Sequence, residues 1–583
     1  MDRSLPAAAA IRPVGYRFAD LRLEADGTLL RGETVFELPA QELSLLRALL
    51  ARPGEAISPD ELNRALWGAT DPFSYQLAAC LASLKKRLQP ADCIESVDRC
   101  GYRITAIVEA DAHLRTHSLP LVAILPFSTG YEVPEYYGLA IAELAMEQLE
   151  RARPAVVSIA APESVLTLAR RELPRQQIGK MLDADLLLTG QVMATPGRYR
   201  LRAEMMRVED GAPLWVEDLI VEREQIAELA RDLADCVRLR LHREGIPLQA
   251  EAAPVVQRET SAARREARDL YFRAHHEWQS MERHSMQDAM RRLLRAVELD
   301  PSLMAARVDL AHLAIFECIH GYMSTRIAAA AVRRAADGIP ALNEKAEALL
   351  PALGWIEFHF DREARSALRM TARAEGLPYD ASNTRVRSWL LLSRGRIGEG
   401  VELLRAAIRH DAYSPGLQTA LGWALHLGGE RDASVAQARD TVDAFPEYDN
   451  SLFFGAMILA HNGEAGRAIE IAETLAARAP HYDLAISAHA YALACAGRAE
   501  ESHNLLERLQ WLSRERFVLK TLNAATHVVL GEADLALAEL RLANESRCPW
   551  FFQTLADPRL APLRGRPEFA ALASTLAAME AGA

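Results

Sequence analysis

Four phrases in the C-terminal half decide the fold of this chain: GGERDASVAQA (428–438), NGEAGRAIEIA (462–472), AGRAEESHNLL (496–506) and LGEADLALAEL (530–540). Each phrase carries a glycine at its start and continues into a segment with helical spacing of apolar residues. The four are copies of one unit, and helix-rich sequence interrupted by Gly or Pro extends from them. Repetition with a fixed period is typical of solenoid proteins, in which each unit packs against its neighbours.

The period of the repeat is near 34 residues. Five glycines mark it, separated by 33, 35, 34 and 34 residues: Gly395, Gly428, Gly463, Gly497 and Gly531. A small residue follows each of them five positions later: Gly400, Ala433, Ala468, Ser502 and Ala536. Two closely packed antiparallel helices leave room only for small side chains at their crossing, and a turn glycine relieves the end of the first helix. This pattern resembles the tetratricopeptide repeat.

The repeats extend well upstream of the four phrases. RRLLRAVELDP (291–301) reads as the second helix of another unit that ends at Asp-Pro. We expect about eight helix pairs between residues 265 and 545. The stretch 551–575 is off the period, and we expect it to cap the open end of the array. Residues 265–583 are therefore predicted to form a tetratricopeptide α-solenoid.

Predicted strands and helices alternate in the region 117–245. LPLVAILPF (119–127) has the composition of a buried strand, GLAIAELAMEQLERA (138–152) that of an amphipathic helix, and AVVSIA (155–160) that of a second strand. A helical LPRQQIGKMLDA, three strands joined by turns and a closing helix over 222–242 follow. This order predicts a mixed α/β domain.

Three phrases of this region resemble the N-terminal domain of TolB, a module found beside winged-helix domains and tetratricopeptide arrays in bacterial regulators. They are Val122–Phe127, Ile178–Val192 and Leu214-Trp215. The resemblance implies a structural and coupling role, and no catalytic residue comes with it. Residues 246–264 are predicted to be the linker into the repeats.

Residues 13–108 read as three short strands, three helices and a terminal hairpin. The strands are YRFADLRLE, TLLRG and TVFEL, and the hairpin is DCIESVDRCGYRIT. The second helix begins in SPDELNRALWG, where Ser58 is the expected N-cap, Pro59 holds the first position and Glu61 follows three residues after the cap. The third helix is SYQLAACLASLKKRL (74–88). The first has a predicted core stripe of Leu43, Leu45, Leu46, Leu49 and Leu50.

This arrangement resembles the OmpR/PhoB-type winged helix, and the match covers the whole region. Its phrases are Leu-Pro-x-x-Glu-x-x-Leu-Leu (38–46), Pro-Gly-x-x-Ile-Ser-x-x-x-Leu (53–62), Leu-Lys-Lys-x-Leu (84–88) and Val-x-x-x-Gly-Tyr-Arg (97–103). The chain as a whole is thus predicted to be multidomain and mainly α, with an N-terminal α+β winged helix, a central α/β domain and a C-terminal solenoid.

The resemblance implies double-stranded DNA as a partner. In that family the third helix enters the major groove and the wing reaches the minor groove, with cations on phosphates and other side chains on base edges. Lys85 falls where the family has a phosphate-contacting Arg, and Trp67 and Tyr102 fall where aromatic residues brace the backbone. The DNA-contacting residues implied in this way are Trp67, Tyr75, Gln76, Ala79, Ser83, Lys85, Lys86, Arg87, Ser96, Arg99, Tyr102 and Arg103.

Several positions depart from the family pattern. Ser83 and Tyr75 stand where the family usually has Arg, Cys80 where it has a phosphate-reaching His, and Asp98 where the wing has Arg or Pro. Gln76 replaces a Thr. Losing two or three charge-assisted contacts of ~1–3 kcal/mol each implies weak DNA binding, or recognition that tolerates A·T base pairs, unless dimerisation or neighbouring copies compensate. A simpler alternative is that Lys85-Lys86-Arg87 is a solvated helix end favoured by the helix dipole.

The composition fits this reading. The net charge of −12 argues against a chain coated in nucleic acid but allows a local basic patch. The seven scattered cysteines form no C-x-x-C pair, which fits a reducing compartment. No apolar run approaches the ~18–20 residues of a membrane span, and the first residues lack the apolar core of a signal peptide. We therefore expect a cytoplasmic protein that does not contact a membrane.

Catalytic, cofactor and metal motifs are missing from the sequence. There is no phosphate-binding G-x-x-x-x-G-K-[ST], no G-x-G-x-x-G after a strand and no G-x-S-x-G elbow. His113 and His117 have a metal-like spacing, but Leu114 follows His113, so H-E-x-x-H is not formed. We expect no enzymatic activity, no cofactor and no bound metal.

The layout resembles HilA-type regulators, which join such a winged helix to tetratricopeptide repeats, and CadC-type regulators in the first domain. It implies a bacterial transcriptional regulator that binds promoter DNA, while the repeats receive a protein partner or self-associate. The alternative is a scaffold whose winged helix does not bind DNA and instead contacts protein, with the repeats as its binding surface.

Overall fold

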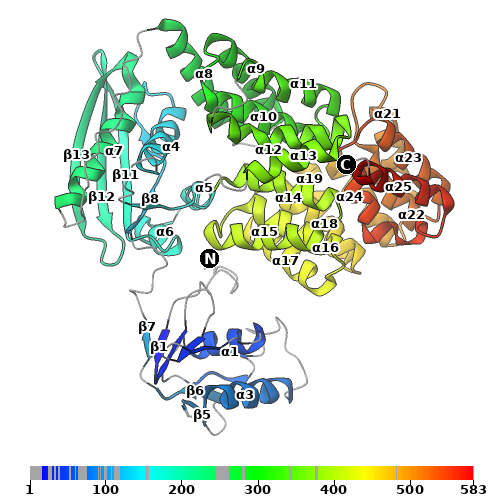
Figure 1. Ribbon diagram of the computed structural model, residues 1–583, viewed down its shortest axis with the longest axis horizontal. Helices are drawn as coiled ribbons and strands as arrows, with labels where there is room; N and C mark the ends of the chain where they lie inside the picture. Colours follow the sequence, from blue (N-terminus) through cyan, green and yellow to red (C-terminus); the bar gives the residue numbers. More distant parts are fainter. Residues whose placement is uncertain are drawn as a thin grey trace. The chain divides into compact units, whose positions relative to one another are not determined.

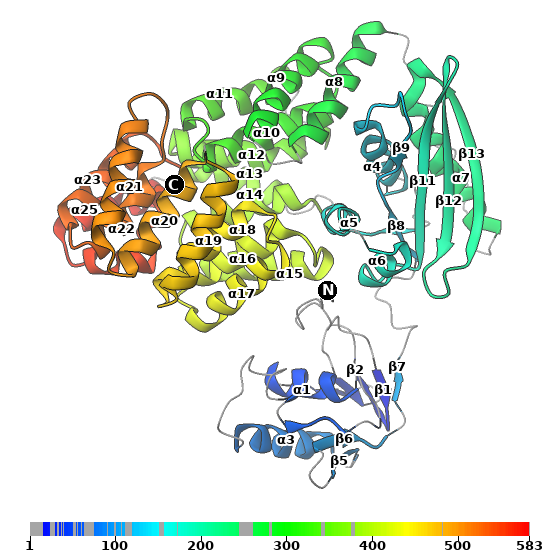
Figure 2. The same ribbon diagram turned by 180° about the vertical axis from the view of Figure 1, so that it is seen from behind.

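The fold divides into two compact units, Met1–Ser118 and Leu119–Ala583. The computed structural model describes residues 16–23, 29–31, 34–36, 38, 40–50, 54, 56–59, 61–62, 75–89, 91, 93–97, 101–106, 108–110, 119–150, 157–171, 173–243, 261–278, 283–339, 344–374, 379–480 and 482–581. Figures 1 and 2 show these parts from opposite sides.

The first unit contains an antiparallel sheet in the order β4-β3-β2-β1-β7. Its strands are β1 (Tyr16–Phe18), β2 (Leu21–Leu23), β3 (Leu29–Arg31), β4 (Thr34–Phe36) and β7 (Val108–Ala110). The prediction of three strands before the first helix is wrong, because YRFADLRLE divides into β1 and β2. Ala19 adopts a left-handed φ of 49° and, with Asp20, turns the chain back on itself. The edge strand β7 was not predicted.

The predicted first and third helices and the hairpin are confirmed. They are α1 (Ala40–Leu50), α3 (Tyr75–Leu88) and the antiparallel pair β5 (Ile94–Val97) and β6 (Gly101–Ile104). The N-cap is also as predicted, since the Glu61 amide donates to the Ser58 hydroxyl at 3.3 Å and the Leu62 amide to the Ser58 carbonyl at 3.0 Å. The rest of the predicted second helix, including Trp67, lies outside the described residues.

The α/β module opens the second unit with a sheet in the order β10-β8-β11-β12-β13, and β9 pairs with β11 beside this path. The strands are β8 (Leu121–Ile124), β9 (Ser128–Thr129), β10 (Ser158–Ile159), β11 (Leu186–Thr195), β12 (Arg198–Arg207) and β13 (Pro213–Glu222). β8 pairs in parallel with β10 and β11, whereas β11, β12 and β13 form the predicted antiparallel meander.

Four helices belong to the module: α4 (Tyr136–Glu150), α5 (Pro162–Ala169), α6 (Arg175–Met181) and α7 (Ile226–Arg243). Three of them were predicted, and α5 was not. Its signal is Pro162 at the first helical position, followed by the apolar stripe Val165 and Leu168, both fully buried. In both views α4 and α5 lie on the side of the sheet that faces the repeats (Figures 1 and 2).

Eight consecutive helix pairs follow in the described residues, as the sequence predicted. The helices are α8 (Ala262–Trp278), α9 (Arg283–Leu299), α10 (Met304–Ile319), α11 (Thr325–Ala336), α12 (Leu350–Ile356), α13 (Ala364–Arg373), α14 (Ala381–Ser393), α15 (Ile397–His410), α16 (Pro415–Leu427), α17 (Arg431–Ala444), α18 (Asp449–His461), α19 (Ala465–Arg478), α20 (Asp483–Cys495), α21 (Ala499–Leu512), α22 (Asn523–Val529) and α23 (Ala533–Glu545).

The structure corrects two positions in the repeat. The left-handed turn glycine of the second phrase is Gly429, with φ 73°, whereas Gly428 is helical with φ −73°. The small residue at the helix crossing is accordingly Ser434, which is 1% exposed, whereas Ala433 is exposed. With Gly429 the turn glycines stand 34 residues apart throughout, because packing of successive units tolerates no change of register.

The C-terminal stretch closes the array as predicted. It forms α24 (Phe551–Ala556), a 3₁₀ helix (Pro558–Leu563) and α25 (Pro567–Ala581). Trp550, Phe551 and Phe552 are 1% exposed or less, and they belong to the same hydrophobic core as the last repeats. Burial of these aromatic rings supplies the apolar cover that the open end of a solenoid needs.

Polar contacts join the α/β module to the repeats. The hydroxyl groups of Tyr136 and Tyr137 donate to Asp269 of α8 at 3.1 and 2.8 Å. On α5, the Ser164 amide donates to the buried Asp411 carboxylate at 2.9 Å, and Glu163 accepts from Arg385 at 2.6 Å. Module and repeats therefore form a connected body within Leu119–Ala583.

Candidate nucleic-acid interface

The third helix buries one face and leaves the other outward. Leu77, Leu81, Leu84 and Leu88 recur at helical spacing, and each is 3% exposed or less. They pack into the same core as Leu45 and Leu49 of α1. Among the described side chains of α3, Ala82 and Lys86 are exposed and Ser83 is half-buried, so these three lie off the buried face.

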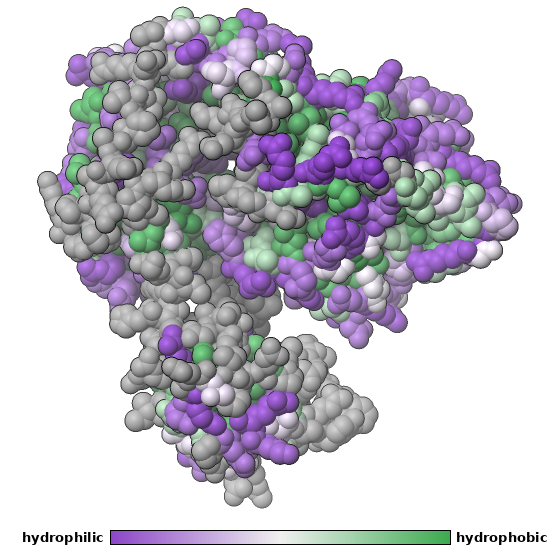
Figure 3. All heavy atoms as spheres, in the orientation of Figure 1, coloured by the Kyte–Doolittle hydropathy of each residue, from purple (hydrophilic) through white to green (hydrophobic). Residues whose placement is uncertain are grey.

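The predicted basic residues stand at the end of α3. Lys86 and Arg87 are exposed and Lys85 is half-buried. Hydrophilic side chains gather over this part of the unit on the face seen in Figure 3. Cations at a helix C-terminus also interact favourably with the helix dipole.

Arg31 on β3 caps the same end of α3. Its two terminal guanidinium nitrogens donate to the carbonyls of Leu88 and Gln89, both at 2.7 Å, and its Nε lies 2.8 Å from Asp20. The last carbonyls of the helix are thus satisfied from the sheet. Lys85 and Lys86 are not needed as caps, which leaves their charge available to a ligand.

Glu42 of α1 holds two of the predicted DNA-contacting residues. The Ser83 hydroxyl donates to Glu42 Oε1 at 2.8 Å, and Arg87 Nε lies 2.9 Å from Glu42 Oε2. The Glu42 side chain is 8% exposed and that of Arg87 is 48% exposed. Burial and the charge of Glu42 also raise the pKa of the Cys80 thiol, so Cys80 stays neutral at pH 7. The carboxylate therefore offsets part of the positive charge on this face.

The wing is attached to the start of the second predicted helix. Ile57 and Tyr102 exchange two backbone hydrogen bonds of 2.9 and 3.0 Å, and the Gly54 amide donates to the Ile104 carbonyl at 3.2 Å. On the hairpin, Ser96 is exposed, and Arg103 donates to Glu95 at 2.8 Å. These bonds fix the hairpin against the helical part of the unit.

The predicted site residues divide into four groups. Ser83, Lys85, Lys86 and Arg87 lie together on the last turns of α3, and Ser96, Tyr102 and Arg103 lie on the hairpin. Tyr75, Gln76 and Ala79 are on α3, but their side chains are outside the description. Trp67 and Arg99 lie outside the described residues. Sequence reasoning missed Glu42, although its motif was quoted, and Arg31, for which the sequence offers no signal.

Replacing Glu42 by Gln should strengthen binding of the full chain to a DNA duplex of mixed sequence at low salt. The change removes one negative charge and releases Arg87, and we expect a gain of about 1 kcal/mol, roughly fivefold in affinity. Fluorescence anisotropy measures it. Glu209→Gln, which neutralises an exposed acid of the α/β module, is the control and should leave affinity unchanged. Unchanged affinity in Glu42→Gln would show that Glu42 does not weaken DNA binding by offsetting the positive charge of this face.

The part of the chain that the structure describes holds no group of three or more His, Cys, Asp or Glu side chains placed to bind a metal ion. None of the helices in the described ranges combines the length and the apolar character that crossing a bilayer requires.

Comparison with known proteins found a family match in the N-terminal region and relatives that cover most of the chain. Residues 32–104 match the family described as transcriptional regulatory protein, C terminal. The chain is 23% identical over 408 residues to the transcriptional regulator HilA of Salmonella typhimurium, covering 68% of this chain and 70% of the relative. HilA of Salmonella typhi is 22% identical over the same length and shares.

Solved structures with local similarity include TolB from Acinetobacter baumannii, at 16% identity and a TM-score of 0.17 over 21% of this chain and 29% of that chain. A tetratricopeptide repeat protein from Parabacteroides merdae is 11% identical, with a TM-score of 0.30 over 54% of this chain and 99% of that chain. The tetratricopeptide protein YrrB is 15% identical, with a TM-score of 0.21 over 34% and 96%.

Proposed function

We propose that this HilA/CadC-like, DNA-binding transcriptional regulator recognises particular promoter sequences with α3 and the β5–β6 hairpin. The family match of residues 32–104 and the similarity to HilA support the regulator itself. The observation that carries the proposal is the position of Lys85, Lys86 and Arg87 on the free end of α3, whose carbonyls are already capped by Arg31. Cations so placed can approach the phosphates of a duplex.

Each predicted residue takes a role in this proposal. Lys85, Lys86 and Arg87 contact phosphates, and Tyr75, Gln76 and Ala79 face base edges in the major groove, where Ser83 joins them only once its hydrogen bond to Glu42 is broken. The wing places Ser96, Arg99, Tyr102 and Arg103 at the adjacent minor groove, and Trp67 braces the sugar-phosphate backbone. Phosphate contacts fix position and base contacts give specificity.

The contacts of Glu42 argue for modest affinity per copy. Ser83 donates to Glu42 and is thereby turned toward α1, and Arg87 is partly neutralised by the same carboxylate. Each well-placed base contact is worth about 1–3 kcal/mol, so discrimination by a single copy is limited. Binding by two copies or by neighbouring sites would restore it. The domain bounds we propose are 13–108, 117–245 and 265–583, with 246–264 as the linker.

Replacing Lys86 by Ala should weaken binding of the full chain to promoter fragments about three- to tenfold at low salt. The loss should be similar for all sequences, and the slope of log affinity against log salt should fall by about 1. Gel shift of upstream genomic fragments at two salt concentrations measures both.

Lys180→Ala is the matched control, because it removes an exposed lysine from α6 and should leave affinity and slope unchanged. If the unaltered chain shifts no fragment at low salt, the regulator proposal fails, and the scaffold, in which the winged helix contacts protein, takes its place.

The repeat array has the remaining role in this proposal. Tetratricopeptide-like helices present a long surface that suits a protein partner or a second copy of the chain. We place the protein in the cytoplasm, where a regulator meets DNA, and assign it no enzymatic activity, cofactor or metal.

A further inference from the structure

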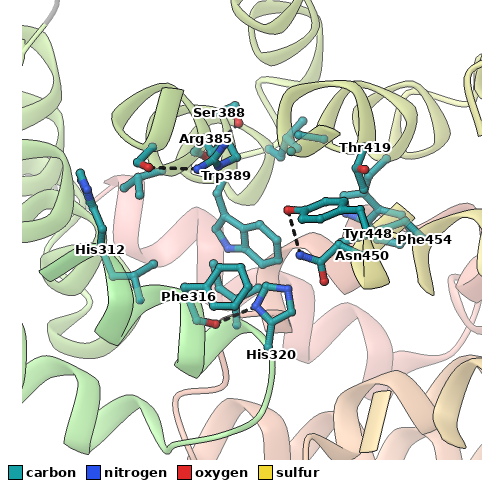
Figure 4. Close-up of a pocket in the computed structure, with 18 of the residues that line it drawn as sticks. His312, Phe316, His320, Arg385, Ser388, Trp389, Thr419, Tyr448, Asn450 and Phe454 are labelled. Atoms are coloured by element: carbon teal, nitrogen blue, oxygen red, sulfur yellow. Dashed lines mark hydrogen bonds between the residues drawn. The ribbon is translucent and has the colours of Figure 1, made fainter. Parts of the chain in front are cut away.

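An aromatic cavity lies among the first helices of five of the repeats. Residues of α8, α10, α14, α16 and α18 line it, and it encloses about 110 Å³ (Figure 4). Its walls include the rings of Trp278, Phe316, Trp389, Trp423 and Phe454. In Figure 4 the Trp389 ring stands in the centre, above Phe316 and His320. A cavity of this kind accommodates a small ring system.

The polar groups of the cavity are cationic or neutral. Arg385 supplies a positive charge, and the described residues that line the cavity include no Asp or Glu. Burial lowers the pKa of His320 to about 4, so its ring is neutral at pH 7, and its Nδ1–H donates to the Phe316 carbonyl at 2.7 Å. Because Glu163 of α5 accepts from Arg385 at 2.6 Å, the guanidinium can attract an added anion only as that pair opens.

Two hydrogen-bond donors in the wall have no acceptor. The indole N–H groups of Trp278 and Trp389 are buried, and within the described part of the chain neither finds a partner. Trp278 is only 8% exposed. Both nitrogens are fully buried, and an unpaired buried donor costs about 1–3 kcal/mol, which an acceptor on a bound molecule would recover once the indole ring turns to bring its N–H to the cavity. Both aromatic area and unpaired donors thus point to a ligand with a ring and an acceptor group.

We propose that this cavity binds a small, flat, apolar molecule that carries a carboxylate. The ring packs among the aromatic walls, and the carboxylate takes the place of Glu163 at Arg385 and accepts from an indole N–H that turns toward it. Edge and face contacts between rings stabilise such a molecule beyond the effect of burial alone. The proposal concerns the repeat array and does not depend on DNA binding by α3.

The same arginine connects the cavity to the α/β module. Arg385 donates to Glu163 of α5 at 2.6 Å and to Ser382 at 3.0 Å. Beside it, the Tyr379 hydroxyl donates to the buried Asp411 at 2.9 Å, and Asp411 accepts from the Ser164 amide of α5. A carboxylate bound at Arg385 competes with Glu163 for the guanidinium. Occupancy of the cavity therefore changes the contact between α5 and the repeats.

Fluorine NMR titration of the full chain with fluorophenylacetate tests the site. We expect saturable binding of one molecule per chain, and at least tenfold weaker binding of the uncharged fluorophenylacetamide. Ala420→Phe, which fills the cavity from α16, should abolish binding, and Trp389→Phe, which keeps the ring but removes the N–H, should weaken it about five- to tenfold. Hydrogen exchange at α5 should rise in the presence of the acid.

Trp511→Phe is the matched control, because Trp511 is 53% exposed on α21, and the change should leave binding unaltered. Circular dichroism establishes that each variant is folded. Absence of saturable binding by the unaltered chain overturns the proposal. Equal affinity for acid and amide also overturns it and indicates a cavity for apolar side chains of a peptide. Equal effects of Trp389→Phe and Trp511→Phe would show that the Trp389 N–H does not bind the ligand. Unchanged hydrogen exchange at α5 would show that the cavity does not affect the contact between α5 and the repeats.

Discussion

Replacing Gly101 by alanine should unfold the β5–β6 hairpin and with it the DNA-binding face. Gly101 has a φ of 119°, and a Cβ placed there would lie 1.9 Å from the Ile57 carbonyl oxygen and 2.6 Å from its carbon. These atoms belong to backbone that is itself hydrogen-bonded to Tyr102, so they cannot yield without breaking the bridge. Backbone strain and overpacking together are expected to cost about 3 kcal/mol or more.

Hydrogen exchange of the full chain measures this loss locally. The backbone amides of Ile57 and Tyr102 should lose protection in Gly101→Ala, while those of α16 and α18 in the repeats should keep theirs. Gly54→Ala is the matched control: Gly54 also has a left-handed φ, 78°, but nothing lies within 4 Å of the added Cβ. It should cost only about 1 kcal/mol. Equal loss in both variants would show that conformation alone, rather than the close approach to Ile57, makes glycine necessary.

The regular parts of this fold were predictable because their signals are local. Turn glycines at a fixed interval and small residues at helix crossings indicated the solenoid, and a chain of short motifs indicated the winged helix. The errors also have local causes. Two adjacent glycines, Gly428 and Gly429, offered alternative turn positions, and only packing of neighbouring units selects the second. Ala19 carries no turn signal, so the β1–β2 turn was missed.

The candidate site was predictable only in part, since its decisive contacts join distant residues. Glu42 and Ser83 are 41 positions apart, and Arg31 reaches the carbonyl of Leu88 57 positions away. No periodicity or motif encodes such pairs, because a hydrogen bond between distant residues depends on the positions of both partners in the fold. The same holds for the cavity, whose aromatic residues come from separate repeats.

Replacing Arg559 by Met should destabilise the C-terminal end of the solenoid by about 3–5 kcal/mol at pH 7, since it leaves the buried Asp557 carboxylate with only His426 and a backbone amide as partners. Arg559 and Asp557 are 4% and 1% exposed, and Arg559 donates to Asp557 Oδ2 at 2.7 Å. The guanidinium also lies over the rings of Trp423 and Tyr491, at 5.3 and 5.0 Å from their centroids. The pair therefore attaches the cap to α16 and α20.

Urea unfolding of the full chain measures the loss of stability. Hydrogen exchange at the amides of α24 shows whether the loss lies at the C-terminal end. The double variant Asp557→Asn/Arg559→Met should recover much of the stability, because no charge is left buried. Arg566→Met is the matched control. Arg566 lies 2.5 Å from Asp534, but the two side chains are 42% and 91% exposed, so this change should cost less than about 1 kcal/mol.

The pH dependence distinguishes a lost ion pair from lost packing. Burial alone raises the pKa of Asp557, but Arg559 and the nearby His426 outweigh it and hold this pKa well below its usual range. The pair in the unaltered chain thus contributes stability above about pH 4 that is lost as the pH falls through the lowered pKa. In Arg559→Met burial acts on the Asp557 carboxylate without the opposing guanidinium, so we expect its pKa to rise and its protonation to relieve the penalty. The deficit of the variant should accordingly shrink between pH 7 and pH 4, and a deficit that stays constant over this range would assign the effect to packing against Trp423 and Tyr491.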